Sequence, residues 1–292
     1  MKVFDYRVAF SRNVGWVTAL EQDRLNGCRV AIAGLGGVGG AHLLTLARLG
    51  VGAFNIADFD HFELQNFNRQ VGATVSNLGL PKTDTMAAMA RDINPELDLR
   101  VFPHGVQPDS VDDFLAGVDV YVDGIDFFAF EARRMLFAAC QRKGIPALTA
   151  APLGMGVSLL YFAPGRTSFE DYFRVDGESH FEQLARFIAG LAPAMLQFGY
   201  LVVPEAVDLL KGKGPSTAMA CDLCAGVMGT SVLKILLGRG VVRPAPWGMQ
   251  FDAYRQKLRF TWRPMGNANP IQQLLLMIIR WKLRGRPAPA VR

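Results

Sequence analysis

The sequence contains little cysteine and little histidine, with four residues of each among 292. Four cysteines do not make a disulfide framework in a chain of this length. No uncharged apolar run reaches the ~18 residues of a transmembrane helix, and the start of the chain carries charges at Asp5 and Arg7, unlike a secretory signal. We therefore expect a cytoplasmic protein without a membrane-spanning segment. The histidines have no spacing typical of a metal site: His42, His61, His104 and His180.

The composition is that of a globular protein, but its charge is unevenly placed. Hydrophobic residues make up 50% of the chain and charged residues 20%, a balance that excludes wholesale disorder. The net charge is +5. From Arg255 to Arg292 there are nine Lys and Arg residues and no Asp or Glu, so the other 254 residues carry −4. A basic C-terminal segment on a mildly acidic body indicates a local electrostatic feature.

Short apolar runs alternate with helix-like segments over the first half of the chain. The alternation predicts an α/β fold with a doubly wound, mostly parallel sheet and helices on both faces. The segment Gly156–Phe162 is expected to add an edge strand. Parallel strands are expected at Arg29–Ala33, which reads as buried, and at Ala53–Ala57, 97–102, 118–123 and 145–150. Helices are expected near 41–49, 83–94 and 128–142.

After Gly165 the alternation ends. We expect an irregular crossover over 164–217 with helices around 181–191 and 204–210, and a C-terminal α/β elaboration over 218–284. We expect one domain over 1–292, with its core at 10–163 and a disordered tail at 285–292. The elaboration is expected to contain a long buried helix at 218–238, a hairpin at 249–262 and a helix at 271–283.

A glycine-rich loop joins the first expected strand to the helix after it. Glycines there let the backbone approach a phosphate, and the helix N-terminus favours negative charge. Asp58 ends the next strand, where a carboxylate can hydrogen-bond ribose hydroxyls. These features predict an adenine-nucleotide site, but the loop does not separate a dinucleotide oxidoreductase from an ATP-using enzyme. The glycines are Gly34, Gly36, Gly37 and Gly39.

The residues that follow Asp58 favour ATP over a dinucleotide. Arg69 and Lys82 add two cations, which suit the β- and γ-phosphates of a triphosphate. Asp126 follows the fourth expected strand, at the carboxyl edge of the sheet where such folds bind ligands. A carboxylate at that place can hold Mg²⁺ between phosphates.

Together these residues resemble the ThiF/MoeB/HesA family, bacterial relatives of the ubiquitin-activating enzymes. The family pattern is a G-x-G-G-x-G loop, D-x-D at the next strand end, N-x-x-R-Q, P-K before a helix, and D-x-x-D after the fourth strand. All five elements occur here in that order. The resemblance covers 10–163, and 218–262 more loosely, and implies a Rossmann-like ThiF-type adenylation domain.

The resemblance also implies roles for individual residues. Asp60 and Gln70 belong to the nucleotide-site motifs and are expected to order the loop. The other implied roles concern the nucleotide and its metal. Asp58 is expected to hold the ribose and Asp126 to bind magnesium. The residues expected to contact phosphates are Asn66, Arg69 and Lys82, and those expected to line the nucleotide are Gly34, Gly36, Gly37 and Gly39.

Arg12 resembles the N-terminal arginine that, in homodimeric members of the family, reaches the phosphates of the partner subunit. The alternative for Arg12 is a surface charge. The resemblance thus implies a homodimer that uses ATP and Mg²⁺.

The implied chemistry is adenylation of a carboxylate with release of pyrophosphate. Positioning and charge neutralisation supply most of such catalysis, so no protein nucleophile is needed. The leading substrate is the C-terminal carboxylate of a ubiquitin-like or sulfur-carrier protein, or of a peptide. The alternative is a tRNA threonylcarbamoyladenosine dehydratase, which the basic C-terminus also suits. A non-catalytic nucleotide-binding scaffold is disfavoured because it has no need for Arg69, Lys82 and Asp126.

The sequence departs from the family at the zinc site and at the pocket. Many members hold zinc with two C-x-x-C pairs, whereas this chain has only Cys221 and Cys224. Two thiolates do not complete a four-coordinate site, so we expect no zinc, and a site shared between the cysteines of two subunits is the remaining alternative. Cys221 is the only cysteine placed to act as an acyl acceptor, and packing at a helix start is the favoured reading. Phe127 stands where many relatives carry asparagine.

The last expected helix has one strongly apolar face, followed by cations. We expect this face to dock on the body of the protein or on a second copy. The less favoured alternatives are an anionic membrane interface and contact with tRNA or an acidic carrier. The face comprises Ile271, Leu274, Leu275, Ile278 and Trp281.

Overall fold

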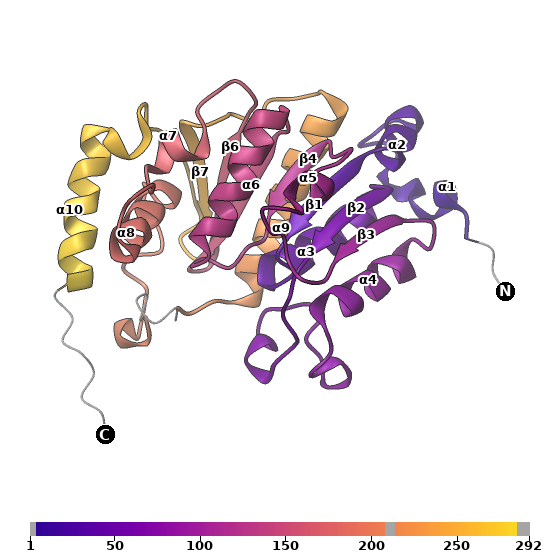
Figure 1. Ribbon diagram of the computed structural model, residues 1–292, viewed down its shortest axis with the longest axis horizontal. Helices are drawn as coiled ribbons and strands as arrows, with labels where there is room; N and C mark the ends of the chain where they lie inside the picture. Colours follow the sequence, from indigo (N-terminus) through magenta and orange to yellow (C-terminus); the bar gives the residue numbers. More distant parts are fainter. Residues whose placement is uncertain (1–3, 208–213, 285–292) are drawn as a thin grey trace.

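A computed structural model describes residues 4–207 and 214–284. One sheet of eight strands runs through the molecule, in the order β3-β2-β1-β4-β5-β6-β7-β8, and helices cover both of its faces (Figure 1). The strands are β1 (Arg29–Ala33), β2 (Ala53–Ala57), β3 (Asp98–Phe102), β4 (Val120–Asp123), β5 (Ala147–Leu153), β6 (Gly156–Phe162), β7 (Trp247–Asp252) and β8 (Lys257–Trp262).

The sheet is parallel from β1 to β5, and β6, β7 and β8 are each antiparallel to their neighbours. The predicted doubly wound, mostly parallel α/β sheet is therefore confirmed. The prediction that Gly156–Phe162 forms an edge is wrong, because β6 pairs with both β5 and β7 and the edge is β8. Six of the seven β6 residues are buried, as suits an internal strand.

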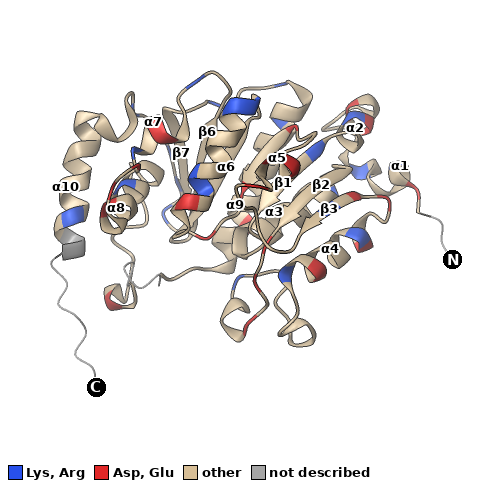
Figure 2. Ribbon diagram, in the orientation of Figure 1, with Lys and Arg blue, Asp and Glu red and all other residues tan. Residues whose placement is uncertain are grey.

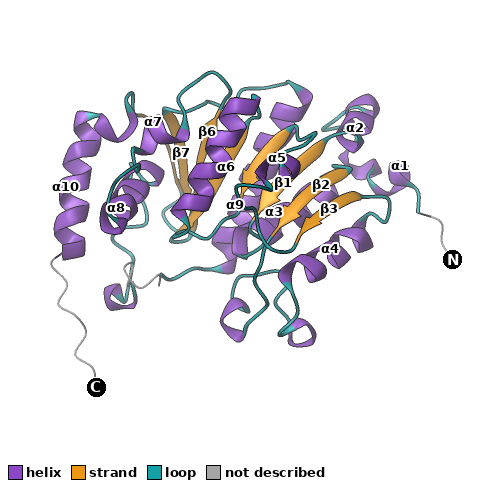
Figure 3. Ribbon diagram, viewed as in Figure 1, coloured by secondary structure: helices purple, strands orange, loops and turns teal. Residues whose placement is uncertain are grey.

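The helices lie between and beside these strands (Figure 3). Short 3₁₀ turns η1 (Ser11–Asn13), η2 (Leu64–Asn66), η3 (Val75–Asn77), η4 (Pro204–Ala206) and η6 (Gly266–Ala268) connect some of them. The α-helices are α1 (Tyr6–Ala9), α2 (Ala19–Asn26), α3 (Gly37–Leu49), α4 (Lys82–Ile93), α5 (Val111–Phe114), α6 (Phe130–Lys143), α7 (Phe169–Phe173), α8 (His180–Leu191), α9 (Ala218–Leu237) and α10 (Pro270–Arg284).

Alternate side chains of β1 contribute to two hydrophobic cores, one on each face of the sheet. Val30 and Ile32 belong to the core cluster that α3, α4 and α9 share, whereas Ala31 and Ala33 belong to the cluster under α5 to α8. Successive side chains of a strand point to opposite faces of the sheet. Because helices cover both faces, all five residues of the strand are buried.

Helices α3 and α9 pack closely and run in the same direction. A Cβ atom on Gly37 would lie 3.0 Å from Sγ of Cys221, and one on Gly229 would lie 3.0 Å from Cγ2 of Thr45. The two contacts are eight residues apart on each helix, so both helices lead away from the glycine loop. Among the described helices α9 alone is long and apolar enough to cross a membrane, but 56% of its most apolar stretch is buried inside the protein. It is a core helix, as predicted.

The crossover contains α8 at its predicted place and the additional short helix α7. A helix was expected over 204–210. This prediction is wrong for the described residues 204–207, where only the 3₁₀ turn η4 forms. Residues 208–213 and the predicted disordered tail 285–292 lie outside the described residues. The predicted hairpin is confirmed as β7 and β8.

Helix α10 docks on α8, but not through its predicted face. Leu276 and Ile279 are buried against α8. Gln272 is also buried and donates to the carbonyl oxygen of Ala189 at 2.9 Å. Leu275 is partly buried, and the rest of the predicted face is exposed: Ile271, Leu274, Ile278 and Trp281. Docking of the predicted face on the body of the protein is therefore wrong, whereas its docking on a second copy is a separate alternative that a single chain does not test.

Candidate active site

The glycine loop is packed too tightly for side chains. Gly34 has φ +84°, and a Cβ atom there would lie 2.2 Å from the carbonyl oxygen of Gly124. A Cβ atom on Gly39 would lie 1.8 Å from the carbonyl oxygen of Gly34. The turn from β1 into α3 is therefore held against the end of β4, and the N-terminus of α3 opens at the carboxyl edge of the parallel strands.

Asp58 ties the end of β2 to this loop. Its Oδ2 accepts a hydrogen bond from the backbone N–H of Leu35 at 2.6 Å, and its Oδ1 accepts one from the N–H of Asp60 at 2.8 Å. A carboxylate has about four lone-pair sites, so two bonds leave acceptor capacity for hydroxyl groups. The position fits the ribose-binding role that the resemblance implies.

Arg69 and Gln70 lie directly against the glycines. A Cβ atom on Gly37 would be 3.4 Å from Cγ of Arg69, and one on Gly36 would be 3.7 Å from Nε2 of Gln70. The Arg69 guanidinium donates only to neutral oxygens, those of Gln65 and Asn68, and pairs with no carboxylate among the described residues. The buried Oε1 of Gln70 has no hydrogen-bond partner there. The stem of Arg69 and the amide Nε2 of Gln70 thus lie beside the anion-binding loop, and the guanidinium has no acidic partner among the described residues.

Asp60 and Asn66 order the segment around this cation. Lys82, whose side chain is 7% exposed, forms an ion pair with Oδ2 of Asp60 at 3.0 Å. Its backbone N–H also donates to the carbonyl oxygen of Asp60. Oδ1 of Asn66 accepts from the N–H of Glu63 at 2.9 Å and closes the η2 turn three residues before Arg69. The loop-ordering role expected of Asp60 agrees with these contacts.

Asp126 stands in the loop after β4 with an exposed carboxylate. One oxygen accepts a hydrogen bond from the N–H of Phe128 at 3.0 Å, which leaves capacity for a ligand. Among residues 4–207 and 214–284 no group of three or more His, Cys, Asp or Glu is arranged to hold a metal ion. A cation at Asp126 would therefore need phosphate oxygens as further ligands, as Mg²⁺ commonly does.

Arg133 fixes the loop that carries Asp126, and sequence reasoning missed it. Its Nη2 donates to the carbonyl oxygens of Ile125, at 2.6 Å, and Asp126, at 3.1 Å, while Nε pairs with buried Asp123. The sequence does contain a feature that could have identified it: Arg133 lies at helical spacing between the apolar residues Phe130 and Phe137. A lone cation on an apolar helix face indicates a buried partner.

The structure does not bring Arg12 to the glycine loop of its own chain. The neighbouring Asn13 donates to the carbonyl oxygen of Leu49, at the C-terminal end of α3. The glycine loop lies at the other end of this 13-residue helix, which at 1.5 Å per residue is ~20 Å away. Arg12 itself is exposed.

Cys221 lies beside the site but has the character of a packing residue. The side chain is buried against Gly37, and burial raises the pKa of the thiol, which nearby Arg69 and a hydrogen bond to Ser216 offset only in part. Burial also raises the pKa of Cys224, one helical turn further on. These contacts favour packing over an acyl-acceptor role, and the absence of zinc stays a prediction.

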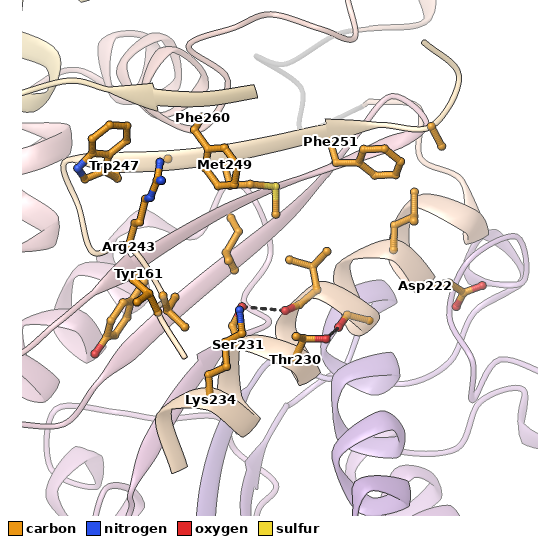
Figure 4. A pocket seen from close by; sticks show the side chains of 18 of the residues that line it. Tyr161, Asp222, Thr230, Ser231, Lys234, Arg243, Trp247, Met249, Phe251 and Phe260 are labelled. Atoms are coloured by element: carbon orange, nitrogen blue, oxygen red, sulfur yellow. Dashed lines mark hydrogen bonds between the residues drawn. The ribbon is translucent and has the colours of Figure 1, made fainter. Parts of the chain in front are cut away.

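A groove of ≈ 1010 Å³ runs between α9 and the strands β6 to β8 (Figure 4). Its walls are mostly apolar, from Met219 and Leu223 on α9 to Met249 and Phe260 on the strands. The guanidinium of Arg243 lies 4.8 Å from the ring centre of Trp247 and 4.9 Å from that of Phe260. Because its lining residues on α9 run from Met219 to Lys234, the groove extends from the glycine-loop end of this helix toward its C-terminal end.

The N-terminal segment adjoins the far end of this groove. Arg239, just after α9, pairs with Glu21 at 3.2 Å and donates to the carbonyl oxygen of Trp16. Val241, two residues later, lines the groove. The N-terminal segment that carries Arg12 therefore lies nearer the end of the groove opposite the glycine loop, although Arg12 itself does not line the groove.

Comparison with known proteins establishes the family. The model of the ThiF family matches residues 10–273. The protein therefore belongs to the ThiF family, as the sequence motifs predict.

Two curated relatives show how the family divides. The chain is 36% identical over 126 residues to the tRNA threonylcarbamoyladenosine dehydratase of Escherichia coli (strain K12), covering 43% of this chain and 46% of that protein. It is 30% identical over 193 residues to the sulfur carrier protein ThiS adenylyltransferase of the same organism, covering 65% and 75%. The chain thus spans less than half the length of the first of these relatives.

Solved structures confirm the fold. The crystal structure of E. coli MccB with MccA-N7isoASN has a TM-score of 0.68 at 18% identity, covering 92% of this chain and 75% of that one. That of E. coli TcdA in complex with AMP has a TM-score of 0.59 at 23% identity, covering 80% and 95%.

Proposed function

We propose that the protein is an ATP-dependent adenylyltransferase that activates a carboxylate. The carrying observation is Arg69, whose aliphatic stem lies against Gly37 of the anion-binding glycine loop and whose guanidinium has no acidic partner among the described residues. Arg is suited to forked phosphate contact. A dinucleotide oxidoreductase has no use for this cation together with Lys82 and the exposed carboxylate of Asp126.

The residues divide the work of the reaction. An oxygen of the substrate carboxylate attacks the α-phosphorus of ATP, the bond from that phosphorus to the β-phosphate bridging oxygen breaks, and pyrophosphate leaves. Arg69 and Lys82 neutralise the charge that develops on the leaving group. Asp126 would hold Mg²⁺, which when bound screens the phosphate oxygens. The glycine loop and Asp58 fix the nucleotide in line with the acyl group.

The proposed substrate is the C-terminal carboxylate of a small carrier protein or a peptide, as the similarity to the ThiS adenylyltransferase supports. The second candidate is the cyclisation of threonylcarbamoyladenosine in tRNA. The similarity to the tRNA dehydratase favours it, as do the nine cations and no acids in residues 255–292.

Exchange of labelled pyrophosphate into ATP distinguishes the two substrates. The assay is run with carrier-protein C-terminal peptides and with tRNA that carries threonylcarbamoyladenosine. Exchange that depends on peptide supports the first candidate, and exchange that depends on modified tRNA supports the second. Absence of exchange with both, in protein shown to be folded, contradicts adenylation of either.

The proposed assembly is a homodimer through the groove. The groove is apolar, and its two ends differ: the glycine loop lies at one and the Arg12 segment at the other. A two-fold axis perpendicular to α9 makes the two copies of this helix antiparallel. Each end of the groove in one subunit then lies opposite the other end of the groove in its partner. This arrangement would bring the Arg12 segment of each subunit toward the glycine-loop end of its partner. Light scattering that gives 32.0 kDa over a wide concentration range contradicts this assembly.

A further inference from the structure

The outward face of α10 is a continuous apolar stripe. Single exposed hydrophobic residues are ordinary on protein surfaces, but a contiguous patch marks an interaction surface. Spacings of three and seven residues place the members on one face of the helix. The stripe consists of Ile271, Leu274, Met277, Ile278 and Trp281, whose exposed fractions range from 46% to 74%.

The stripe is held outward by the opposite face of the helix. Leu276 and Ile279 are buried against α8, and the buried amide of Gln272 bonds to Ala189. Nε of Arg280 donates to Oε2 of Glu182 on α8 at 3.0 Å. Rotation of α10 to hide the stripe would expose two core side chains and break these polar contacts.

The C-terminal segment that carries the stripe has charge of one sign. From residue 253 to the end of the chain the sequence has no Asp or Glu. Accordingly α10 has no acidic residue in Figure 2. Arg280 pairs with Glu182, and three further cations follow the stripe in the sequence at Lys282, Arg284 and Arg286. A complementary partner must therefore be both anionic and apolar.

We propose that α10 docks the protein on an anionic lipid bilayer, with the stripe facing the acyl boundary. Such a surface supplies apolar depth for five side chains and negative charge for the basic end of the helix. A second copy would bring the same cations and no acids from this segment. A nucleic acid would supply phosphates but leave the stripe uncovered. The C-terminal residues 285–292 contain one large apolar residue, Val291, too few to cover it.

The docking rests on α10 alone and does not depend on the nucleotide site. Membrane binding by one interfacial helix scales with the buried apolar area and with attraction to anionic lipid. Binding is therefore reversible, and added salt weakens it because salt screens the cations.

Co-sedimentation of the full-length protein with lipid vesicles tests the proposal. Vesicles of phosphatidylcholine are compared with vesicles that also contain phosphatidylglycerol, at low and high salt. The test variant is Leu274→Ser with Ile278→Ser, which changes two exposed residues and no charge. The matched control is Val75→Ser with Val202→Ser, at positions 83% and 90% exposed elsewhere on the surface.

We expect the native protein and the control to bind anionic vesicles, and to bind neutral vesicles far more weakly. The double α10 variant should lower the partition coefficient about tenfold or more, because two apolar side chains no longer enter the interface. Trp281→Ser, at a position 74% exposed in the last turns, gives a second reading should the double variant misfold.

Other outcomes overturn the proposal. These are failure of the native protein to bind anionic vesicles, and equal binding by native protein and both α10 variants. Loss of the dimer in the α10 variants, seen by sedimentation velocity, would assign the stripe to a second copy. Loss of salt-sensitive tRNA binding with vesicle binding unchanged would assign it to nucleic acid.

Discussion

The Arg133 guanidinium and the Asp123 carboxylate form a buried ion pair directly behind the loop that presents Asp126. The Nε–Oδ2 distance is 2.8 Å, and the two side chains are 3% and 1% exposed. Arg133 also bonds the carbonyl oxygens of Ile125 and Asp126, so one side chain joins the core of the sheet to the proposed magnesium ligand.

Arg133→Met should lower the free energy of unfolding by about 3–5 kcal/mol, because it leaves Asp123 buried and unpaired. Adding Asp123→Asn should recover part of that stability, since the unpaired charge is then removed. Arg134→Met is the matched control: Arg134 is 28% exposed and pairs with Glu170 at the surface, so its loss should cost about 0–1 kcal/mol. Urea unfolding measures all three, and equal losses for Arg133 and Arg134 would refute the structural role.

Gly34→Ala should destabilise the protein by more than about 2 kcal/mol, since an alanine there has φ +84° and its Cβ overlaps the carbonyl oxygen of Gly124. Gly27→Ala is the control, because φ is −84° and the added Cβ meets its nearest atom at 3.5 Å. Its stability should change by less than about 1 kcal/mol. Thermal unfolding checks both, and a Gly34→Ala protein as stable as the control would contradict the tight turn.

Mixing two inactive variants should restore activity if Arg12 acts across the dimer. Arg12→Ala and Asp126→Ala each remove one component of every site, so each alone should lack pyrophosphate exchange. After subunit exchange, half of the dimers are mixed, and each has one site with both residues intact. We expect about a quarter of the native activity. No recovery after demonstrated exchange would show that Arg12 does not act in trans.

Stability should fall in acid partly because of His42. Both ring nitrogens are buried without hydrogen-bond partners in the described part of the chain, and burial lowers the pKa to about 3. In the unfolded chain the pKa is ~6.5. The unfolded state therefore binds the extra proton first, and stability is lost as pH falls below ~6.5, by up to ~1.4 kcal/mol per pH unit.

The variant His42→Met should unfold with a shallower dependence on pH between 7.5 and 4.5 than the native protein. His104→Met replaces an exposed histidine and should keep the native slope. Denaturant titrations at several pH values compare the three slopes. Indistinguishable slopes for native protein and His42→Met would mean that His42 is not buried in its neutral form.

The sequence predicted the five parallel strands because short, largely apolar runs alternate with helix-like segments over this half of the chain. It did not reveal that β6 is internal, since its partner β7 begins at Trp247, 85 residues after β6 ends. It did not reveal which face of α10 contacts α8, because the polar Gln272 was not expected to be buried with its amide bonded to Ala189.

The site residues, too, could be predicted where they belong to local motifs and not where their role depends on distant contacts. The glycine loop, Asp58 and Arg69 belong to local motifs, and the structure brings them together. Arg133 was missed because its role, which is to hold the loop that carries Asp126, depends on Asp123 and on carbonyl oxygens that only the folded loop presents. The reach of Arg12 depends on a second subunit, and no local pattern contains that geometry.

The most direct test of the account is calorimetric titration of the protein with ATP and Mg²⁺, beside the same titration with NAD. We predict that ATP binds and NAD does not, and that Arg69→Met weakens ATP binding at least tenfold because it removes the unpaired cation from the glycine loop. Tight binding of NAD with no binding of ATP would contradict the account.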